Sequence, residues 1–159
     1  MTQPILLRQR RLDLVLVAIF GCFALTSFLF DFAAGLDAGP DTLLGKGVHT
    51  YAQLADPLVG QNPLWLRVAS FISGAVFGPF YIVLVYGLIH DRRWIRVPSL
   101  IYIGAILYSM VLYYSVELAG PLPPTNYAIF FGSTLPYVLA PLLLAWRLWR
   151  SRELGVDGT

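Results

Sequence analysis

The chain has 159 residues, of which 57% are hydrophobic and only 13% are charged, and its mean hydropathy is +0.68. A soluble domain usually has about 25% charged residues, so this composition excludes an ordinary water-exposed surface and indicates an integral membrane protein. The formal net charge of +2 is too small and too scattered for a nucleic-acid-binding protein. The single cysteine, Cys22, excludes an intrachain disulfide, and we expect it to be a small buried residue within an apolar run.

Four apolar runs are long enough to cross a bilayer as helices, which takes about 20 residues each. Because lipid cannot satisfy open backbone groups, every run is expected to be helical. We therefore predict an all-α, polytopic membrane protein: an amino-terminal segment, residues 1–11, precedes a four-helix domain, 12–152, and a disordered tail, 153–159. The first run is longer than the core of a typical signal peptide, so we expect it to be retained. The predicted spans are residues 12–34, 64–89, 97–119 and 127–149.

Basic residues differ between the two sides of the predicted bundle. Nine arginines fall on the side shared by the two termini and the second loop, whereas only Lys46 and Arg67 fall on the other side. Because basic loops stay cytoplasmic, both termini are expected in the cytoplasm, with the long first loop, residues 35–63, facing outward. Since the basic residues are nearly all arginine and no lysine-rich retrieval signal ends the chain, we favour a bacterial cytoplasmic membrane over the endoplasmic reticulum.

Each predicted span carries one face of small or polar residues, spaced three or four apart as a helix requires. Such faces are common wherever membrane helices pack, whatever their function. Three prolines, Pro79, Pro136 and Pro141, are expected to loosen helices, because proline removes a backbone hydrogen bond. The four faces are Ala24, Ser27, Asp31 and Gly35; Ser70, Ser73, Gly74, Phe77, Gly78 and Tyr81; Ala105, Ser109, Tyr113 and Glu117; and Ser133, Tyr137, Pro141 and Leu144.

Two acids, Asp31 and Glu117, lie near the outer ends of predicted spans, where an uncompensated charge is costly. One interpretation is that each carboxylate reaches the outer membrane interface. The other is that it forms the polar end of an apolar cavity. Tyr113 lies one turn before Glu117, where its hydroxyl could hydrogen-bond that carboxylate. In the first loop, Asp56 followed by Pro57 is typical of a helix start, so Asp56 is expected to cap a short helix.

The sequence lacks the residue patterns that several kinds of chemistry require. No histidine or cysteine pattern has the spacing of a metal site. No nucleophile–base pair of the serine-hydrolase type and no glycine-rich phosphate loop can be identified. We therefore expect no metal and no cofactor.

Five segments occur in the same order, with nearly the same spacing, in the EXPERA family, which the chain therefore resembles. That family includes the sigma-2 receptor and the sterol isomerase called emopamil-binding protein, and the similarity is greatest to the sigma-2 receptor type. The segments are "FLFDF" at Asp31, "YAQLADPLVGQNPLW" from Tyr51 to Trp65, "PFY" at Pro79, "WIRVPSLIY" from Trp94 to Tyr102, and "LPYVLAP" from Leu135 to Pro141.

This resemblance implies a ligand cavity among four membrane helices, open sideways toward lipid, with the first loop folded over it as a cap that Asp56 supports. It also implies that Asp31 pairs with the cationic amine of a ligand, that Ser109 replaces a family threonine, and that Tyr137 is the family tyrosine of the fourth span. The receptor has a second-span glutamate that shares a proton with the first-span aspartate. Ser73 stands there in this chain, so Asp31 lacks that partner. Family members pair through their helices, so a homodimer is an expectation.

Two functional hypotheses follow, with a third kept open. The first is a non-enzymatic binder or carrier of a sterol-like or cationic amphiphilic molecule, in contact with membrane lipids. The second is a membrane isomerase of sterol- or isoprenoid-like lipids, with Asp31 or Glu117 as acid or base, and the third is a small accessory subunit of a membrane complex. The small number of acids favours the binder over the enzyme. Its predicted ligand-binding residues are Asp31, Ser73, Phe77, Tyr81, Ser109, Tyr113 and Tyr137.

Overall fold

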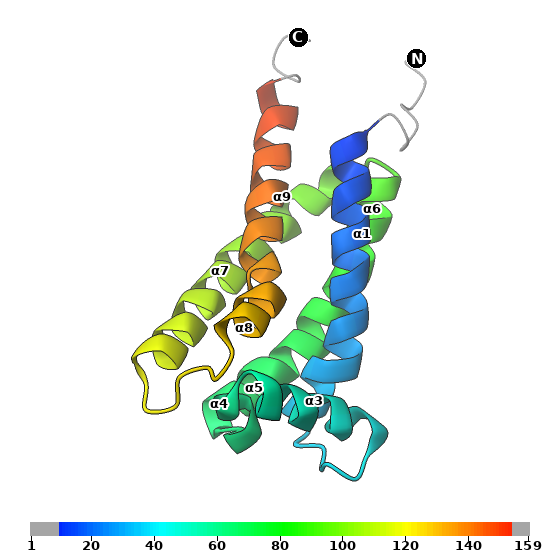
Figure 1. Cartoon of the computed structure of the whole chain (residues 1–159). Coiled ribbons are helices and arrows are strands. Elements are labelled where there is room, and N and C mark those ends of the chain that lie inside the picture. The colour runs from blue at the N-terminus through cyan, green and yellow to red at the C-terminus, as the bar shows by residue number, and fades with distance from the viewer. Residues whose placement is uncertain (1–9, 154–159) are drawn as a thin grey trace.

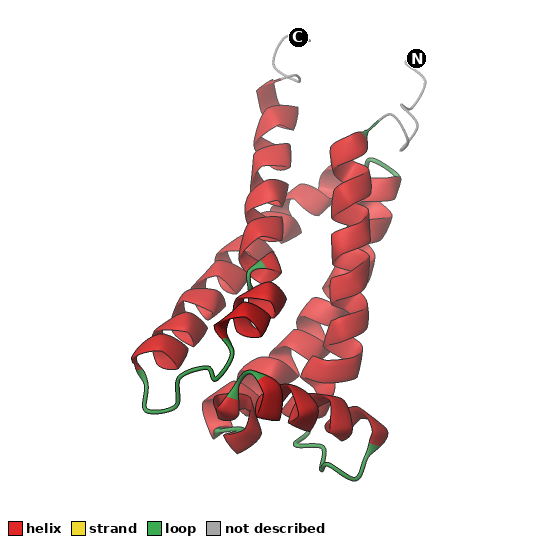
Figure 2. Ribbon diagram, viewed as in Figure 1, coloured by secondary structure: helices red, strands yellow, loops and turns green. Residues whose placement is uncertain are grey.

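The computed structural model describes residues 10–153, with side chains through residue 150; within that range it contains helices and turns and no strand (Figures 1 and 2). Four of its helical stretches are long and apolar enough to cross a membrane, which confirms the all-α, four-span architecture. The amino-terminal segment up to residue 9, and the predicted tail beyond residue 153, lie outside the described residues. The four stretches are Arg11–Gly35, Leu64–Ile89, Arg93–Ala119 and Tyr127–Arg150.

The first two spans each contain a π turn, in which one extra residue is accommodated and the backbone hydrogen bonds join residues five apart instead of four. The first span consists of α1 (Arg11–Thr26), the π turn η2 (Ser27–Asp31) and α2 (Phe32–Gly35). The second consists of α5 (Leu64–Ile72), the π turn η3 (Ser73–Phe77) and α6 (Gly78–Ile89). Pro79 is the second residue of α6, whose first residue follows η3 directly. A wider turn moves the carbonyl four residues earlier away from the proline ring, so the helix continues past Pro79.

The third and fourth spans each consist of two elements. A short 3₁₀ turn, η4 (Arg93–Ile95), leads into α7 (Arg96–Ala119). The fourth span divides into α8 (Tyr127–Thr134) and α9 (Pro136–Glu153), because Pro136 has no backbone N–H to continue α8. Pro141 remains inside α9.

The start of α1 and the end of α9 lie at one end of the bundle, here named the proximal end (Figure 1). The first loop forms α3 (Leu43–Leu54) and α4 (Pro57–Gln61), which lie at the opposite, distal end (Figure 1). Along the bundle, α1 packs against α6, and α7 packs against α9. The core between them is rich in aromatic and leucine side chains, including Leu16, Phe20, Tyr81, Leu84 and Leu144, all fully buried.

The outer surface of the bundle exposes large apolar side chains such as Leu25, Ile101 and Val111, as a lipid-facing surface does. Cys22 lies on this surface, so the expectation that it is buried is wrong: its position on α1 turns it away from the other helices. Where the first two spans meet, the backbones approach closely. A Cβ atom on Gly74 would lie 2.9 Å from the Cα of Phe32, and one on Gly35 would lie 2.5 Å from the Cα of Phe71. These glycines therefore serve packing within the chain.

Candidate functional site

The two π turns bring three polar residues together in the membrane-spanning part of the bundle. Asp31 ends η2, Ser27 begins it, and Ser73 begins η3 on the neighbouring span. Ser73 Oγ donates to Asp31 Oδ2 over 2.6 Å, and Ser27 Oγ donates to the same oxygen over 3.0 Å. Asp31 is only partly exposed, and its Oδ1 accepts no hydrogen bond from the side chains or backbone of residues 10–150. These three residues are here named the Asp31 centre: its carboxylate has two hydroxyl donors on Oδ2 and, among the described residues, none on Oδ1.

Aromatic rings lie beside the Asp31 centre. Tyr102 donates to the hydroxyl of Tyr81 over 3.3 Å, while Tyr137 stacks on Phe23 with ring centroids 4.2 Å apart. Asp31 is close enough to Tyr81 and Tyr137 to interact with both electrostatically. Phe77 completes the cluster against Tyr102, at 5.4 Å between ring centroids. The faces of such rings attract cations and also pack well against flat apolar ligands.

A second polar group, the distal centre, consists of Asp56, Tyr113 and Glu117. Asp56 is fully buried at the start of α4, with Pro57 as the first helical residue, and its Oδ1 accepts from the backbone N–H of Val59 over 3.2 Å. The Tyr113 hydroxyl donates to Asp56 Oδ2. The expected bond from Tyr113 to Glu117 is therefore wrong, because the folded first loop brings the carboxylate of Asp56 to that hydroxyl.

Glu117 is fully buried, which contradicts the interpretation of this acid as a carboxylate that reaches the membrane interface. Its carboxylate lies close enough to that of Asp56 for the two to interact electrostatically. Neither of its oxygens receives a bond from an N–H or hydroxyl donor in the described part of the chain. In the described part of the chain, the distal centre therefore places a buried carboxyl group without a hydrogen-bond donor beside one that has two donors.

The predicted ligand-binding residues thus divide between two groups. Asp31, Ser73, Phe77, Tyr81 and Tyr137 belong to the Asp31 centre and its aromatic neighbours, whereas Tyr113 belongs to the distal centre. Ser109 is partly buried on α7 and has no hydrogen bond to either group.

Further hydrogen bonds tie the first loop to the distal end of the bundle. The hydroxyls of Tyr51 on α3 and Ser133 on α8 are 3.0 Å apart, and the backbone N–H of Thr125 donates to the carbonyl of Ala55 over 2.9 Å. Burial raises the pKa of Tyr51 above its usual value, so its hydroxyl stays protonated. These bonds join segments before and after the second and third spans.

A bond network holds the first loop at its beginning as well. Asn62 Nδ2 donates to Asp37 Oδ1 over 2.7 Å, and Arg67 lies 3.2 Å from Asp37 Oδ2. The hydrogen bond from Asn62, followed by the charge of Arg67, holds the pKa of Asp37 below its usual value. Asp37 is therefore ionised at neutral pH.

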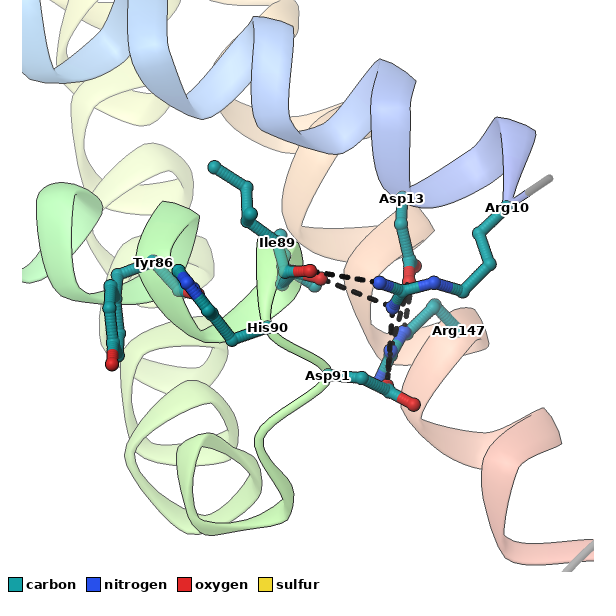
Figure 3. Close-up of polar contacts among 8 residues, drawn as sticks. Arg10, Asp13, Tyr86, Ile89, His90, Asp91 and Arg147 are labelled. Atoms are coloured by element: carbon teal, nitrogen blue, oxygen red, sulfur yellow. Dashed lines mark hydrogen bonds and ion pairs between the residues drawn. The ribbon is translucent and has the colours of Figure 1, made fainter. Parts of the chain in front are cut away.

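At the proximal end, an ion-pair network joins three parts of the chain (Figure 3). Asp13 on α1 is buried; it accepts from Arg10 at 2.7 Å and from two nitrogens of Arg147 on α9 at 2.9 and 3.0 Å. Asp91, after α6, lies 3.3 Å from Arg10 and 3.0 Å from Arg147. The sequence alone gave Arg10 and Arg147 only a role in predicting the membrane orientation of the chain, and it identified neither Asp13 nor Asp91 as a site residue. The available signal was Asp13 itself, an acid at the start of an apolar run.

Comparison with known proteins gives one match. The model of a family described as EBP: EXPERA (EXPanded EBP superfamily) matches residues 43–148, more than half of the chain. No curated protein and no solved structure matches the chain. The matched segment contains Asp56, Ser73, Tyr113 and Tyr137, but it begins after Asp31.

Proposed function

Because the chain belongs to the EXPERA superfamily, we propose that it binds or carries a hydrophobic molecule with a polar end, such as a sterol-like lipid or a cationic amphiphile, within the membrane. In this proposal the polar end of the ligand meets the Asp31 centre, and its apolar body lies against the aromatic neighbours. The cavity would open toward lipid, from which such a ligand enters.

The observation that carries this proposal is the unequal use of the two Asp31 oxygens. Ser27 and Ser73 both donate to Oδ2, and Oδ1 has no partner in the described part of the chain. Two hydroxyl donors stabilise the ionised carboxylate, and the remaining oxygen can accept from a ligand hydroxyl or ammonium group. At low local dielectric, a carboxylate attracts a cation far more strongly than it does in water.

Ser73 affects which ligands this centre would favour. The sigma-2 receptor type has an acid at this place, which shares a proton with the first-span aspartate. A serine donates a hydrogen bond to Asp31 but cannot share a proton with it as a second carboxyl group would. The proposed site is therefore suited to a single positive charge or to a hydroxyl donor.

An acid/base isomerase is the alternative. Such an enzyme needs its proton donor and acceptor within reach of one substrate. Asp31 accepts from Ser27 and Ser73, whereas Glu117 lies beside Asp56 in the distal centre, and neither acid forms an ion pair with a basic residue among those described. We therefore favour the binder.

Native mass spectrometry of the protein in mild detergent, followed by lipid extraction, tests the proposal. Asp31→Asn removes the charge, and Asp41→Asn is the matched control, because Asp41 is exposed in the first loop and forms no ion pair in the described structure. We expect a defined hydrophobic molecule in the wild type and in Asp41→Asn, and its loss in Asp31→Asn. Retention of the same molecule by Asp31→Asn, or its absence from all three proteins, would refute the proposal.

Incubation of the recovered ligand with the protein in D₂O separates the binder from the isomerase. A binder returns the ligand unchanged. An isomerase that moves a proton to or from carbon introduces deuterium and shifts the ligand mass by one unit or more.

A further inference from the structure

The proximal end carries a cavity that plays no part in the proposed ligand site. Its volume is about 340 Å³. Four arginines and two aspartates line it, so positive charges exceed negative ones by two. We propose that this cavity binds the phosphate of an anionic membrane lipid. The lining residues are Arg10, Arg11, Leu12, Asp13, Asp91, Arg147 and Arg150.

The two aspartates that line the cavity form ion pairs with only two of its four arginines. Asp13 and Asp91 both pair with Arg10 and with Arg147 (Figure 3). Arg11, on α1, and Arg150, on α9, have no carboxylate partner within residues 10–150, where side chains are described. Arg150 lies over the ring of Trp146, 5.0 Å from its centroid. Among the described residues, two guanidinium groups on neighbouring helices thus have no carboxylate partner, and such groups bind anions such as phosphate.

Arg10 supplies a further donor that nothing in the described structure uses. Its two Nη atoms are held by Asp13 and by the carbonyls of Leu88 and Ile89, at 2.7 to 3.1 Å. Its Nε is buried and has no acceptor in the described part of the chain. A buried donor without an acceptor is costly, so an oxygen from a ligand would stabilise it. A phosphate oxygen is the acceptor that suits a guanidinium group best.

The start of α1 adds to this preference for an anion. The first backbone N–H groups of a helix have no partner inside it, and they carry partial positive charge. Arg10, the residue before α1, provides no side-chain cap for them. Arg11, Leu12 and Asp13 form this first turn and all line the cavity.

Two tryptophans indicate that the anion belongs to a lipid. Trp94 on η4 and Trp146 on α9 are exposed, at 54% and 51%, and belong to the segments at the proximal end. Exposed tryptophans at the ends of spans lie at the level of the lipid headgroups. A cavity at this level meets lipid phosphate at far higher local concentration than phosphate in solution. Its two excess positive charges favour lipids with a net negative charge over zwitterionic lipids.

Lipid titration followed by native mass spectrometry tests this proposal. Delipidated protein in mild detergent is titrated with phosphatidylglycerol and, separately, with phosphatidylcholine. The test variant is Arg11→Gln/Arg150→Gln, whose two side chains are exposed and hold no ion pair among the described residues. The charge-matched control is Arg92→Gln/Arg93→Gln, since both residues are exposed and do not line the cavity. Inorganic phosphate is added as a competitor in a third arm.

We expect the wild type and the control to bind phosphatidylglycerol more tightly than phosphatidylcholine. The test variant should bind phosphatidylglycerol about thirtyfold more weakly, from the loss of two arginines near the surface. Equal weakening in the test and control variants would show unspecific charge attraction and overturn the proposal. So would equal binding of the two lipids by the wild type. Competition by inorganic phosphate at concentrations similar to those of the lipid would show a free-phosphate site, and would overturn the assignment to lipid.

Discussion

Tyr113 on α7 donates a hydrogen bond to the carboxylate of Asp56, the residue that begins α4. One side chain thus caps a short loop helix and binds the third span at the same time. The first loop is held at the distal end by a buried contact. The pair joins residues that are 57 positions apart.

Replacement of Asp56 by alanine should reduce the free energy of unfolding by about 2–4 kcal/mol. The loss of a helix cap costs about 1 kcal/mol, and the buried hydroxyl of Tyr113 loses its acceptor. Denaturant unfolding in mild detergent measures the effect. Tyr113→Phe is the control, because it removes the donor but keeps the cap, so its cost should be clearly smaller. Equal stabilities of Asp56→Ala and the wild type would contradict the role of this pair.

Two glycine substitutions should differ sharply. Gly74→Ala places a Cβ atom 2.9 Å from the Phe32 backbone, so we expect a loss of about 1–3 kcal/mol. Gly104→Ala is the matched change at a helix position with nothing within 4 Å, and it should leave stability unchanged or raise it by up to about 1 kcal/mol. Melting temperatures of the two purified variants in the same detergent give the comparison. A similar effect of both substitutions would mean that the first two spans pack less closely than described.

The proximal ion-pair network should depend on Asp13 far more than on Asp91. Asp13→Asn removes a carboxylate with 5% exposure from between two arginines, and we expect a loss of about 3 kcal/mol. The side chain of Asp91 is 64% exposed, so Asp91→Asn should cost less than about 1 kcal/mol. Unfolding at low and high salt checks this ranking, since salt screens the exposed pair more than the buried one. The reverse order would show that the exposed aspartate carries the network.

Membrane orientation is open to a direct test in a cysteine-free Cys22→Ala background. If the arginine-rich proximal end is cytoplasmic, a membrane-impermeant thiol reagent added to whole cells should label Thr125→Cys, in the third loop. The same reagent should label Arg92→Cys only after the membrane is permeabilised. Both residues are exposed, so burial does not limit either reaction. Labelling of Arg92→Cys in intact cells would reverse the proposed orientation.

The all-α membrane architecture could be predicted from the order of residues along the chain. Four apolar runs of sufficient length leave no other way to satisfy their backbone groups in lipid. The helix start at Asp56 and Pro57 is likewise a local property, because the capping side chain and the N–H of Val59 are only three residues apart. Such features depend on neighbours along the chain, and those neighbours are visible in the sequence.

Which polar groups meet depends on how the helices and the first loop pack in three dimensions. Helical spacing predicted that Tyr113 and Glu117 share one face of a helix. It could not predict that the folded first loop brings the carboxylate of Asp56 to the Tyr113 hydroxyl. The two π turns shift the phase of their helices, so that Ser27 and Ser73 reach the same oxygen of Asp31. Asp13 and Arg147 meet across 134 positions because the start of α1 and the end of α9 lie at the same end of the bundle. Contacts of this kind depend on how whole helices pack, and the spacing of residues along one chain carries no direct sign of them.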